Sequence, residues 1–404
     1  MRRLISRTVL ASLCGVFILV MPLGVGWGQE EGVTDTTVKI GSINDTTGGL
    51  AAYGNTRVEA HKALINHIND QGGINGRKLI YINESDNYEP TKTVLAFKKL
   101  MEVDKVFCMA SVLGVTNTMA IAPEVQSRKI PYLMIGGNSS KLFFPPQRYI
   151  FGIWPTYEHF QQIILDFIAD ELKMPNAKIA HIHQDTESGR DSVRGMDAYL
   201  PKYPGMKLVA REAFKYGTLD YSATVFKAKE ANPDVVVMST ILTQSAAIAK
   251  EMEKIGWKPI VVMDAANPDP KLPALGGTAV EGAYIQANFP MIDHDVPGVL
   301  LLKEVIRKYF PDSKINPSPY GLSGFIEMQF ALEGIKRAGR NLTREAVIEA
   351  MHNAMKDVDL GSIPPVSYGP DKHWGSNQSY FLQVKDGKLL KATGWRAPKY
   401  PMEK

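Results

Sequence analysis

Cysteine is scarce in this 404-residue chain, which contains only Cys14 and Cys108. Two cysteines cannot form the disulfide framework that stabilises small secreted domains, so the chain must rely on hydrophobic cores. Cys108 lies within the apolar run 106–110, where a thiol packs as a small hydrophobic side chain. We therefore expect this thiol to be buried and unreactive.

Long hydrophobic runs are absent after residue 25, so the chain beyond that point is not expected to span a membrane. The N-terminal run 9–25 follows three arginines and precedes a small-residue site, Gly-Trp-Gly, that ends at Gly28. This arrangement predicts a secretory signal peptide over residues 1–28, cleaved near Gly28, and a secreted protein. An uncleaved membrane anchor is the alternative, although Pro22 within the run favours cleavage.

An excess of one charge is also missing. The chain has 46 Lys and Arg against 42 Asp and Glu, a formal charge of +4, and three of the arginines lie in the predicted signal peptide. Its removal leaves +1, so there is no electrostatic case for a nucleic-acid partner. Removal of Cys14 also leaves Cys108 without a partner for an intramolecular disulfide.

Motifs of catalysis and cofactor binding are absent as well. No phosphate-binding Gly-x-x-x-x-Gly-Lys-Ser/Thr loop follows a strand, and Gly48-Gly49 does not begin a Gly-x-Gly-x-x-Gly fingerprint. His181 and His183 share one strand face, but no third metal ligand is suitably spaced. We therefore predict no catalytic residues, no metal and no cofactor, and a protein that is not an enzyme.

The chain alternates strand and helix patterns, which predicts an α/β fold with mainly parallel sheets. Expected strands are 38–43, 78–83, 106–110, 130–135, 178–183, 207–214, 234–238, 260–263 and 282–288. Expected helices are 55–69, one beginning at 90, 117–127, 157–172, 188–200, 221–230, 244–255, 296–309, 320–338 and 343–353. Asp386-Gly387 predicts a hairpin between 380–385 and 388–393. Two strand–helix series indicate two doubly wound, Rossmann-like lobes.

Ligands of open α/β sheets bind beyond the carboxyl ends of the strands, and those loops are rich here in small hydroxyls, amides and glycines. At 115–117 such a loop precedes a helix, whose free N–H groups and dipole attract an anion. Four aromatic residues lie near these loops: Tyr53, Tyr88, Trp154 and Tyr157. Their side chains could contact the apolar part of a ligand or pack in the core, and the sequence leaves both interpretations open.

These stretches carry a resemblance to a known family. The segments "VKIGSINDTTGGLAAYGN", "TNTMAIAPEVQSRKIPYLMIGG", "NPDVVVMST" and "EGAYIQANFP" occur in order. They resemble the leucine/isoleucine/valine-binding family of ABC-transporter substrate-binding proteins, over essentially the whole chain after the signal. The resemblance implies a type I periplasmic binding protein: two lobes joined by a three-crossover hinge, with a ligand cleft between them. It divides the chain into 35–155 plus 284–365 and 156–283 plus 366–404.

The resemblance also implies a ligand site. A carboxylate would rest in two first-lobe loops, and the positions that match are Val115, Thr116, Gly136 and Asn138. The aromatic residue that would line the ligand site in this family matches Tyr53. In the second lobe, two tyrosine positions fall on Ser188 and near Ile241, and the acid that would hold an ammonium falls beside Asp264. The loss of polar groups there leaves two ligand classes open, an amino acid or an aromatic or aliphatic carboxylic acid.

The implied function is a periplasmic receptor that delivers its ligand to a membrane ABC permease. An extracytoplasmic sensor of the same fold, regulating a partner protein, is the alternative. We expect a monomer in either case.

Mass spectrometry of the exported protein tests the export prediction. The N-terminus is expected at or near residue 29, because the small-residue site ends at Gly28. An intact Met1 in the exported chain would contradict cleavage.

Overall fold

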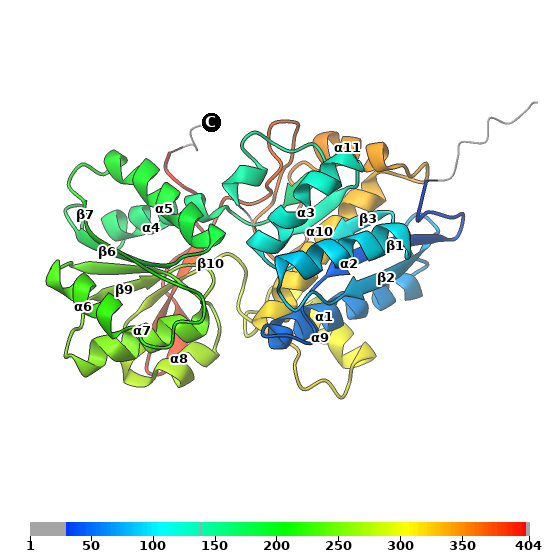
Figure 1. The fold of residues 1–404 in the computed structure, drawn as a ribbon. Helices are drawn as coiled ribbons and strands as arrows, with labels where there is room; N and C mark the ends of the chain where they lie inside the picture. The colour runs from blue at the N-terminus through cyan, green and yellow to red at the C-terminus, as the bar shows by residue number, and fades with distance from the viewer. Residues whose placement is uncertain (1–29, 138, 401–404) are drawn as a thin grey trace, which may run out of the picture.

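The computed structural model describes residues 30–137 and 139–400, which form two α/β lobes side by side (Figure 1). The predicted signal peptide, residues 1–28, and the predicted site residue Asn138 lie outside the described residues. Each lobe is a sheet covered by helices on both faces, so the predicted α/β class is confirmed.

The first lobe contains a parallel sheet that, within the described residues, has the order β2-β1-β3-β4-β5. Its strands are β1 (Thr37–Ile43), β2 (Lys78–Glu84), β3 (Cys108–Ala110), β4 (Tyr132–Ile135) and β5 (Ile150–Gly152). Its helices are α1 (Ala51–Asp70), α2 (Pro90–Glu102), α3 (Val115–Ser127), α9 (Pro297–Tyr309), α10 (Pro319–Arg337) and α11 (Arg344–Asn353). Helices α1 and α10 pack on each other, as do α2 and α3.

The second lobe contains a sheet with the order β12-β11-β10-β9-β8-β6-β7 within the described chain. Its strands are β6 (Lys178–Gln184), β7 (Lys207–Phe214), β8 (Val235–Ser239), β9 (Ile260–Met263), β10 (Tyr284–Ala287), β11 (Tyr380–Lys385) and β12 (Lys388–Lys391). Its helices are α4 (Tyr157–Asp170), α5 (Glu187–Tyr199), α6 (Ser222–Glu230), α7 (Leu242–Lys254) and α8 (Lys271–Gly276). Among these described strands only β11 runs antiparallel to its neighbours, β10 and β12.

Side-chain alternation places this sheet between two hydrophobic layers. Along β11, Tyr380 and Leu382 face the core under α6 and α7, while Phe381 faces the core under α4. Phe381 stacks on Phe167 of α4 with their ring centroids 3.9 Å apart. Period-two alternation therefore buries both faces of the strand, as expected for a sheet covered by helices on each side.

The chain crosses between the lobes three times within the described residues. The crossovers are residues 153–156, 288–296 and 377–379, each between elements of different lobes. Two expected boundaries are wrong. Residue 284 begins β10, which pairs with β9 and β11, so the second crossover follows Ala287. Residues 366–376 return along the first lobe, where Val366 bridges Val358 and Trp374 bridges Gly152.

The expected helices and strands match the observed ones to within a few residues, but β5 and α8 are missed. They span three and six residues, too few to show a hydrophobic period. Cys108 is buried and free, and burial raises the pKa of its thiol to about 12. None of the helices described is long and apolar enough to cross a membrane.

Candidate functional site

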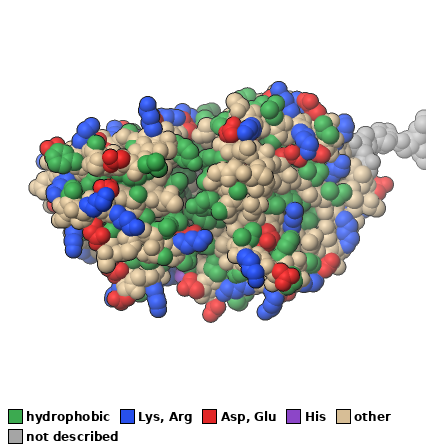
Figure 2. Space-filling model, turned by 60° about the horizontal axis from the view of Figure 1, so that its bottom comes forward, with side chains coloured by type: hydrophobic (Ala, Val, Ile, Leu, Met, Phe, Trp, Pro, Cys, Tyr) green, Lys and Arg blue, Asp and Glu red, His purple; other side chains and the backbone are tan. Residues whose placement is uncertain are grey.

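The two lobes meet near the carboxyl ends of their strands, a region referred to below as the cleft. Tyr320 of α10 donates a hydrogen bond to the carbonyl oxygen of Ala266, which follows β9, at 3.4 Å. Nearer the first crossover, Lys141 pairs with Glu187 at 2.6 Å. Hydrophobic side chains lie along the seam between the lobes (Figure 2).

On the first-lobe side, the cleft contains the N-terminus of α3. The cap residue Gly114 has φ of +99°, a conformation that favours glycine, and no described side chain caps the helix. A Cβ on Gly137 would lie 2.5 Å from the backbone nitrogen of Val115, so glycine there permits close approach to the helix end. Val115 itself is buried and Thr116 is exposed. This end of α3 is a suitable place for an anion.

Gly136 lies in the same region but differs from its predicted role. Its N–H donates to the carbonyl oxygen of Val112 at 3.0 Å and so is not free to hold a ligand. A Cβ at this position would approach that oxygen to 2.7 Å and Arg57 Nη2 to 3.0 Å. Gly136 therefore keeps the loop close to the lobe core rather than donating to a ligand.

Two buried carboxylates hold the neighbouring loops. Asp45 accepts the backbone N–H groups of Thr47, Gly48 and Leu50, the first two at 3.1 and 2.6 Å. Asp86 accepts from the backbone of Tyr88 and from the side chains of Thr93 and Asn117, all at 2.7 to 2.9 Å. These bonds satisfy both charges and fix the loops after β1 and β2.

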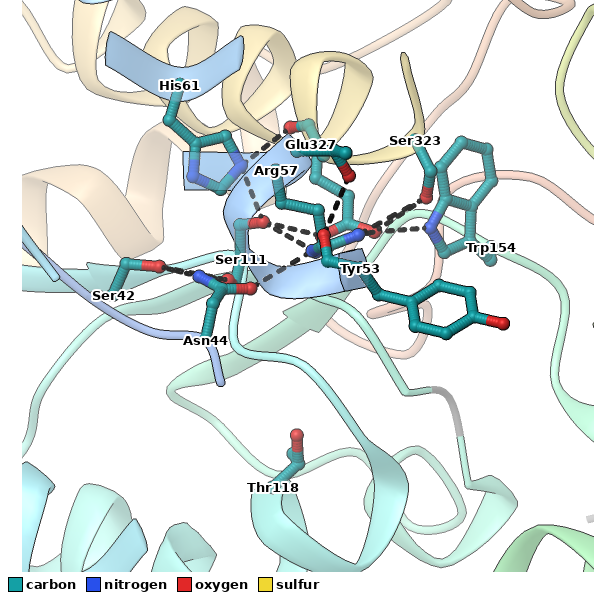
Figure 3. Close-up of polar contacts among 12 residues, drawn as sticks. Ser42, Asn44, Tyr53, Arg57, His61, Ser111, Thr118, Trp154, Ser323 and Glu327 are labelled. Carbon is teal, nitrogen blue, oxygen red and sulfur yellow. Dashed lines mark hydrogen bonds and ion pairs between the residues drawn. The ribbon is translucent and has the colours of Figure 1, made fainter. Parts of the chain in front are cut away.

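Beneath these loops lies a buried ion pair between Arg57 of α1 and Glu327 of α10 (Figure 3). Ser111 Oγ donates to Glu327 Oε2 at 2.7 Å and accepts from Arg57 Nη2 at 2.8 Å. Asn44 Oδ1 accepts from Arg57 Nε at 3.0 Å, and Trp154 Nε1 donates to Glu327 Oε1 at 2.8 Å. The pair thus joins β1, β3, α1, α10 and the first crossover.

His61 borders this network in a defined neutral form. Its Nδ1 lies 2.8 Å from the hydroxyl of Tyr81, and its Nε2 lies 3.1 Å from the carbonyl oxygen of Gly324. The carbonyl can only accept, so Nε2 carries the proton and Nδ1 accepts from Tyr81. Burial, and secondarily the charge of Arg57, hold the pKa of His61 well below its usual value. The histidine therefore adds no positive charge beside Arg57.

On the second-lobe side, Asp264 follows β9 and is 2% exposed. Its Oδ1 accepts from the backbone N–H of Ala266 and from Asn267 Nδ2, both at 3.1 Å. Its Oδ2 has no hydrogen-bond partner among the described residues. Burial raises the pKa of this carboxyl to about 7, against the opposing effect of the two hydrogen bonds. An ionised Asp264 would therefore gain from a nearby cation.

Tyr157, in the first turn of α4, connects two predicted site residues. Burial, and secondarily the charge of Asp264, raise the pKa of its phenol, against a smaller opposing effect of the nearby Ser188 hydroxyl of α5. The structure therefore brings Ser188, Tyr157 and Asp264 together. Ile241 is the cap residue of α7, and its N–H is bound to Gln244 Oε1 at 3.3 Å.

Tyr53 lies in the first turn of α1 and points away from the Arg57 network (Figure 3). Its ring meets that of Tyr320 edge to face, with centroids 4.1 Å apart. Burial raises the pKa of Tyr53, and Asp269 of the second lobe adds to this effect. Tyr53 is thus placed at the cleft, as a wall residue requires.

Sequence reasoning missed Arg57, Glu327 and Tyr320. Arg57 had a signal, because it falls on the helical stripe that continues through Ala60 and Leu64, where an arginine requires a buried partner. No local sequence pattern identified Glu327 as that partner. Tyr320 was predicted only as the first residue of a helix.

Other features of the described chain lie outside this cleft. A cavity of about 470 Å³ lies at the amino ends of β9 and β10, lined by residues that include Met252, Trp257 and Tyr284. Asp264 lies at the other end of β9, just after its carboxyl end. No group of three or more His, Cys, Asp or Glu among the described residues is placed to hold a metal ion.

Substitution of Glu327 tests the buried pair. Glu327→Gln leaves Arg57 buried without its anion, so the free energy of unfolding in urea is expected to fall by about 3–5 kcal/mol. The double variant Arg57→Met/Glu327→Leu removes both charges and is expected to recover most of that loss. A single variant within 1 kcal/mol of the native protein would contradict the role of the pair.

Comparisons with known proteins agree with this architecture. Residues 37–388 match the family model described as periplasmic binding protein. A Leu/Ile/Val-binding protein homolog 7 from Brucella abortus is 22% identical over 369 residues, covering 87% of this chain and 90% of that protein.

Two solved structures share the fold. One is a branched chain amino acid ABC transporter protein from Thermus thermophilus with bound valine, with a TM-score of 0.82, 22% identity and coverage of 91% of this chain and 98% of that one. The other is a fatty acid ABC transporter substrate-binding protein from Thermomonospora curvata, with a TM-score of 0.80, 22% identity and coverage of 92% and 95%. The predicted resemblance and the type I periplasmic binding fold are confirmed. The chain belongs to the periplasmic binding protein family, a family of substrate-binding proteins.

Proposed function

We propose that this protein is the solute receptor of an ABC transporter, and that it clamps a small carboxylate-bearing ligand between its lobes and delivers it to a membrane permease. The observation that carries the proposal is the pairing of opposite electrostatic features across the cleft. The N-terminus of α3 belongs to the first lobe, and Asp264 belongs to the second. A ligand that touches both connects the lobes.

The mechanism is a shift between open and closed arrangements about the three crossovers. A ligand changes this equilibrium only through contacts that it makes better in one arrangement than in the other. A shift from 1% to 99% closed requires about 5.5 kcal/mol of differential affinity. Contacts to α3 alone cannot supply it, because α3 is equally available in both arrangements. The second-lobe contacts of Asp264, Tyr157 and Ser188 are therefore the ones that favour closure.

The ligand's head group decides the role of Asp264. The α-ammonium of an amino acid would pair with the open Oδ2 of Asp264. A plain carboxylic acid offers no cation, and Asp264 would then be only partly ionised near neutral pH, since its pKa is raised to about 7. The similar proteins include one solved with bound valine and one from a fatty acid ABC transporter, so the proposal includes both ligand classes.

Small-angle X-ray scattering tests the clamp. A thermal-shift screen of amino acids and carboxylic acids first identifies a ligand. Saturation with that ligand is expected to decrease the radius of gyration, because closure brings the lobes together. An unchanged radius at saturation would contradict a clamp mechanism.

Calorimetry on Asp264→Asn separates the two ligand classes. For an amino acid, the variant is expected to lose about 2–5 kcal/mol of binding free energy, because a buried charge pair is broken. Affinity should also fall as the pH is lowered through about 7, since binding an ammonium requires the deprotonated carboxyl. For a carboxylic acid, the variant and the native protein should bind alike.

The matched control is Asp234→Asn. Asp234 accepts from the backbone of Lys178 at the amino end of β6, far along the strand from the cleft. Its substitution is expected to leave affinity unchanged. Equal losses in both variants would show that the effect of Asp264→Asn is not local to the ligand.

Tyr53→Ala tests whether Tyr53 contacts the apolar part of the ligand. Removal of the ring is expected to abolish most binding of a ligand with an apolar body, because the contact area on that side of the cleft is lost. Full affinity in both Tyr53→Ala and Asp264→Asn would place the ligand on other residues.

A further inference from the structure

Tyr88, in the loop after β2, is held in an unusual backbone conformation. Asn87 and Tyr88 have φ of +51° and +58°, and a bulky aromatic residue is rarely left-handed. The conformation is maintained by Asp86, whose Oδ1 accepts the N–H of Tyr88 at 2.9 Å. Asp86 is in turn fixed by Asn117 of α3 at 2.7 Å. Strained residues that the surrounding structure maintains in this way cluster at binding sites.

The conformation places the ring of Tyr88 over the end of α3. A Cβ on Gly114 would lie 2.5 Å from Tyr88 Cε2 and 3.1 Å from its hydroxyl oxygen. The ring therefore lies directly against the cap residue of the helix whose N-terminus faces the cleft. A group held at that N-terminus would contact Tyr88.

Two tyrosines of the second lobe, Tyr157 and Tyr216, lie near enough to Tyr88 for electrostatic interaction. Burial raises the pKa of Tyr88 to about 12, and Tyr216 of the loop after β7 adds to this effect. Tyr88 likewise adds to the effects of burial and of Asp264 in raising the pKa of Tyr157. These three rings make no ring-to-ring contact with one another among the described residues. With Tyr53 and Tyr320, five tyrosines of the described chain thus converge on the cleft from five separate segments.

Tyrosine side chains that line a ligand site favour a ligand with an aromatic ring over one with a saturated ring. Aromatic rings gain from each edge-to-face or offset contact with another ring beyond the area that they bury, whereas a saturated body gains the area alone. We propose that Tyr88 contacts the ligand and that, with Tyr157 and Tyr216, it selects a ligand with an aromatic body. This inference rests on the proposed clamp and adds the chemical class of the ligand's apolar part, for either head group.

Matched probes test this selection. Calorimetry on the full secreted chain would compare L-phenylalanine with L-cyclohexylalanine, and phenylacetate with cyclohexylacetate. Within each pair the head group and the connectivity of the carbon atoms are the same, and the two members differ only in whether the six-membered ring is aromatic or saturated. In at least one pair the aromatic member is expected to bind about tenfold tighter, the factor that corresponds to about 1.4 kcal/mol of ring pairing. Saturated members that bind equally or better, or no binding by any of the four probes, would overturn the proposal.

Variants then locate the selectivity. Tyr88→Leu keeps an apolar side chain but removes the ring, and it is expected to reduce the aromatic preference several-fold, whereas Tyr88→Phe should retain it. Tyr216→Leu gives the same test without a folding burden, because Tyr216 is 59% exposed. Phe226→Leu, at a similarly exposed site on α6, is the control and should leave the preference unchanged.

The outcomes separate this inference from the proposed function. A preference unchanged by both Tyr88→Leu and Tyr216→Leu would overturn the assignment of these tyrosines. If a saturated ligand from the wider screen compacts the protein in scattering, the clamp stands and the aromatic selection fails. If the aromatic probes bind with the expected preference but without compaction, the selection stands and the clamp fails.

Discussion

The buried ion pair between Arg57 and Glu327 is the constraint on which the first lobe depends. Two charges removed from water are tolerated only when their remaining hydrogen bonds are satisfied, and here Ser111, Asn44 and Trp154 satisfy them. These partners come from the ends of two strands and from a crossover, and the ion pair itself joins two helices, so the relative positions of all these segments are fixed together. The loops that follow β1 and β3 are thereby held in fixed positions by the buried ion pair.

This rigidity determines how the cleft works. Asp45 and Asp86 fix the loops above the ion pair, and their charges are already satisfied by backbone and side-chain donors. The first lobe therefore presents a preformed surface, in which the N-terminus of α3 is the feature open to an anion. Movement between the lobes is then expected at the crossovers, because packed interiors do not deform continuously.

The sequence predicted most of the helices and strands because they carry a local hydrophobic period, which β5 and α8 are too short to show. It could not assign β10 to a sheet, since a strand's pattern does not identify its neighbours, and the pairing with β9 and β11 required the structure. Asp264 was located only through the family resemblance. The partner of Arg57 lies 270 residues away along the chain, a separation that no local pattern bridges. Long-range polar pairing is therefore what sequence reasoning lacked.

The distribution of charge between the lobes also suggests an order of events. In an open arrangement, a ligand's anionic end can reach α3 without any second-lobe contact. The open oxygen of Asp264 becomes a partner only when the lobes approach, and burial in the described arrangement, where the lobes touch, raises the pKa of that carboxyl. First-lobe contacts would then capture many carboxylates weakly, whereas closure tests the rest of the ligand against Asp264 and the tyrosines. In the proposed clamp, discrimination between ligands therefore belongs to the closing step rather than to the first encounter.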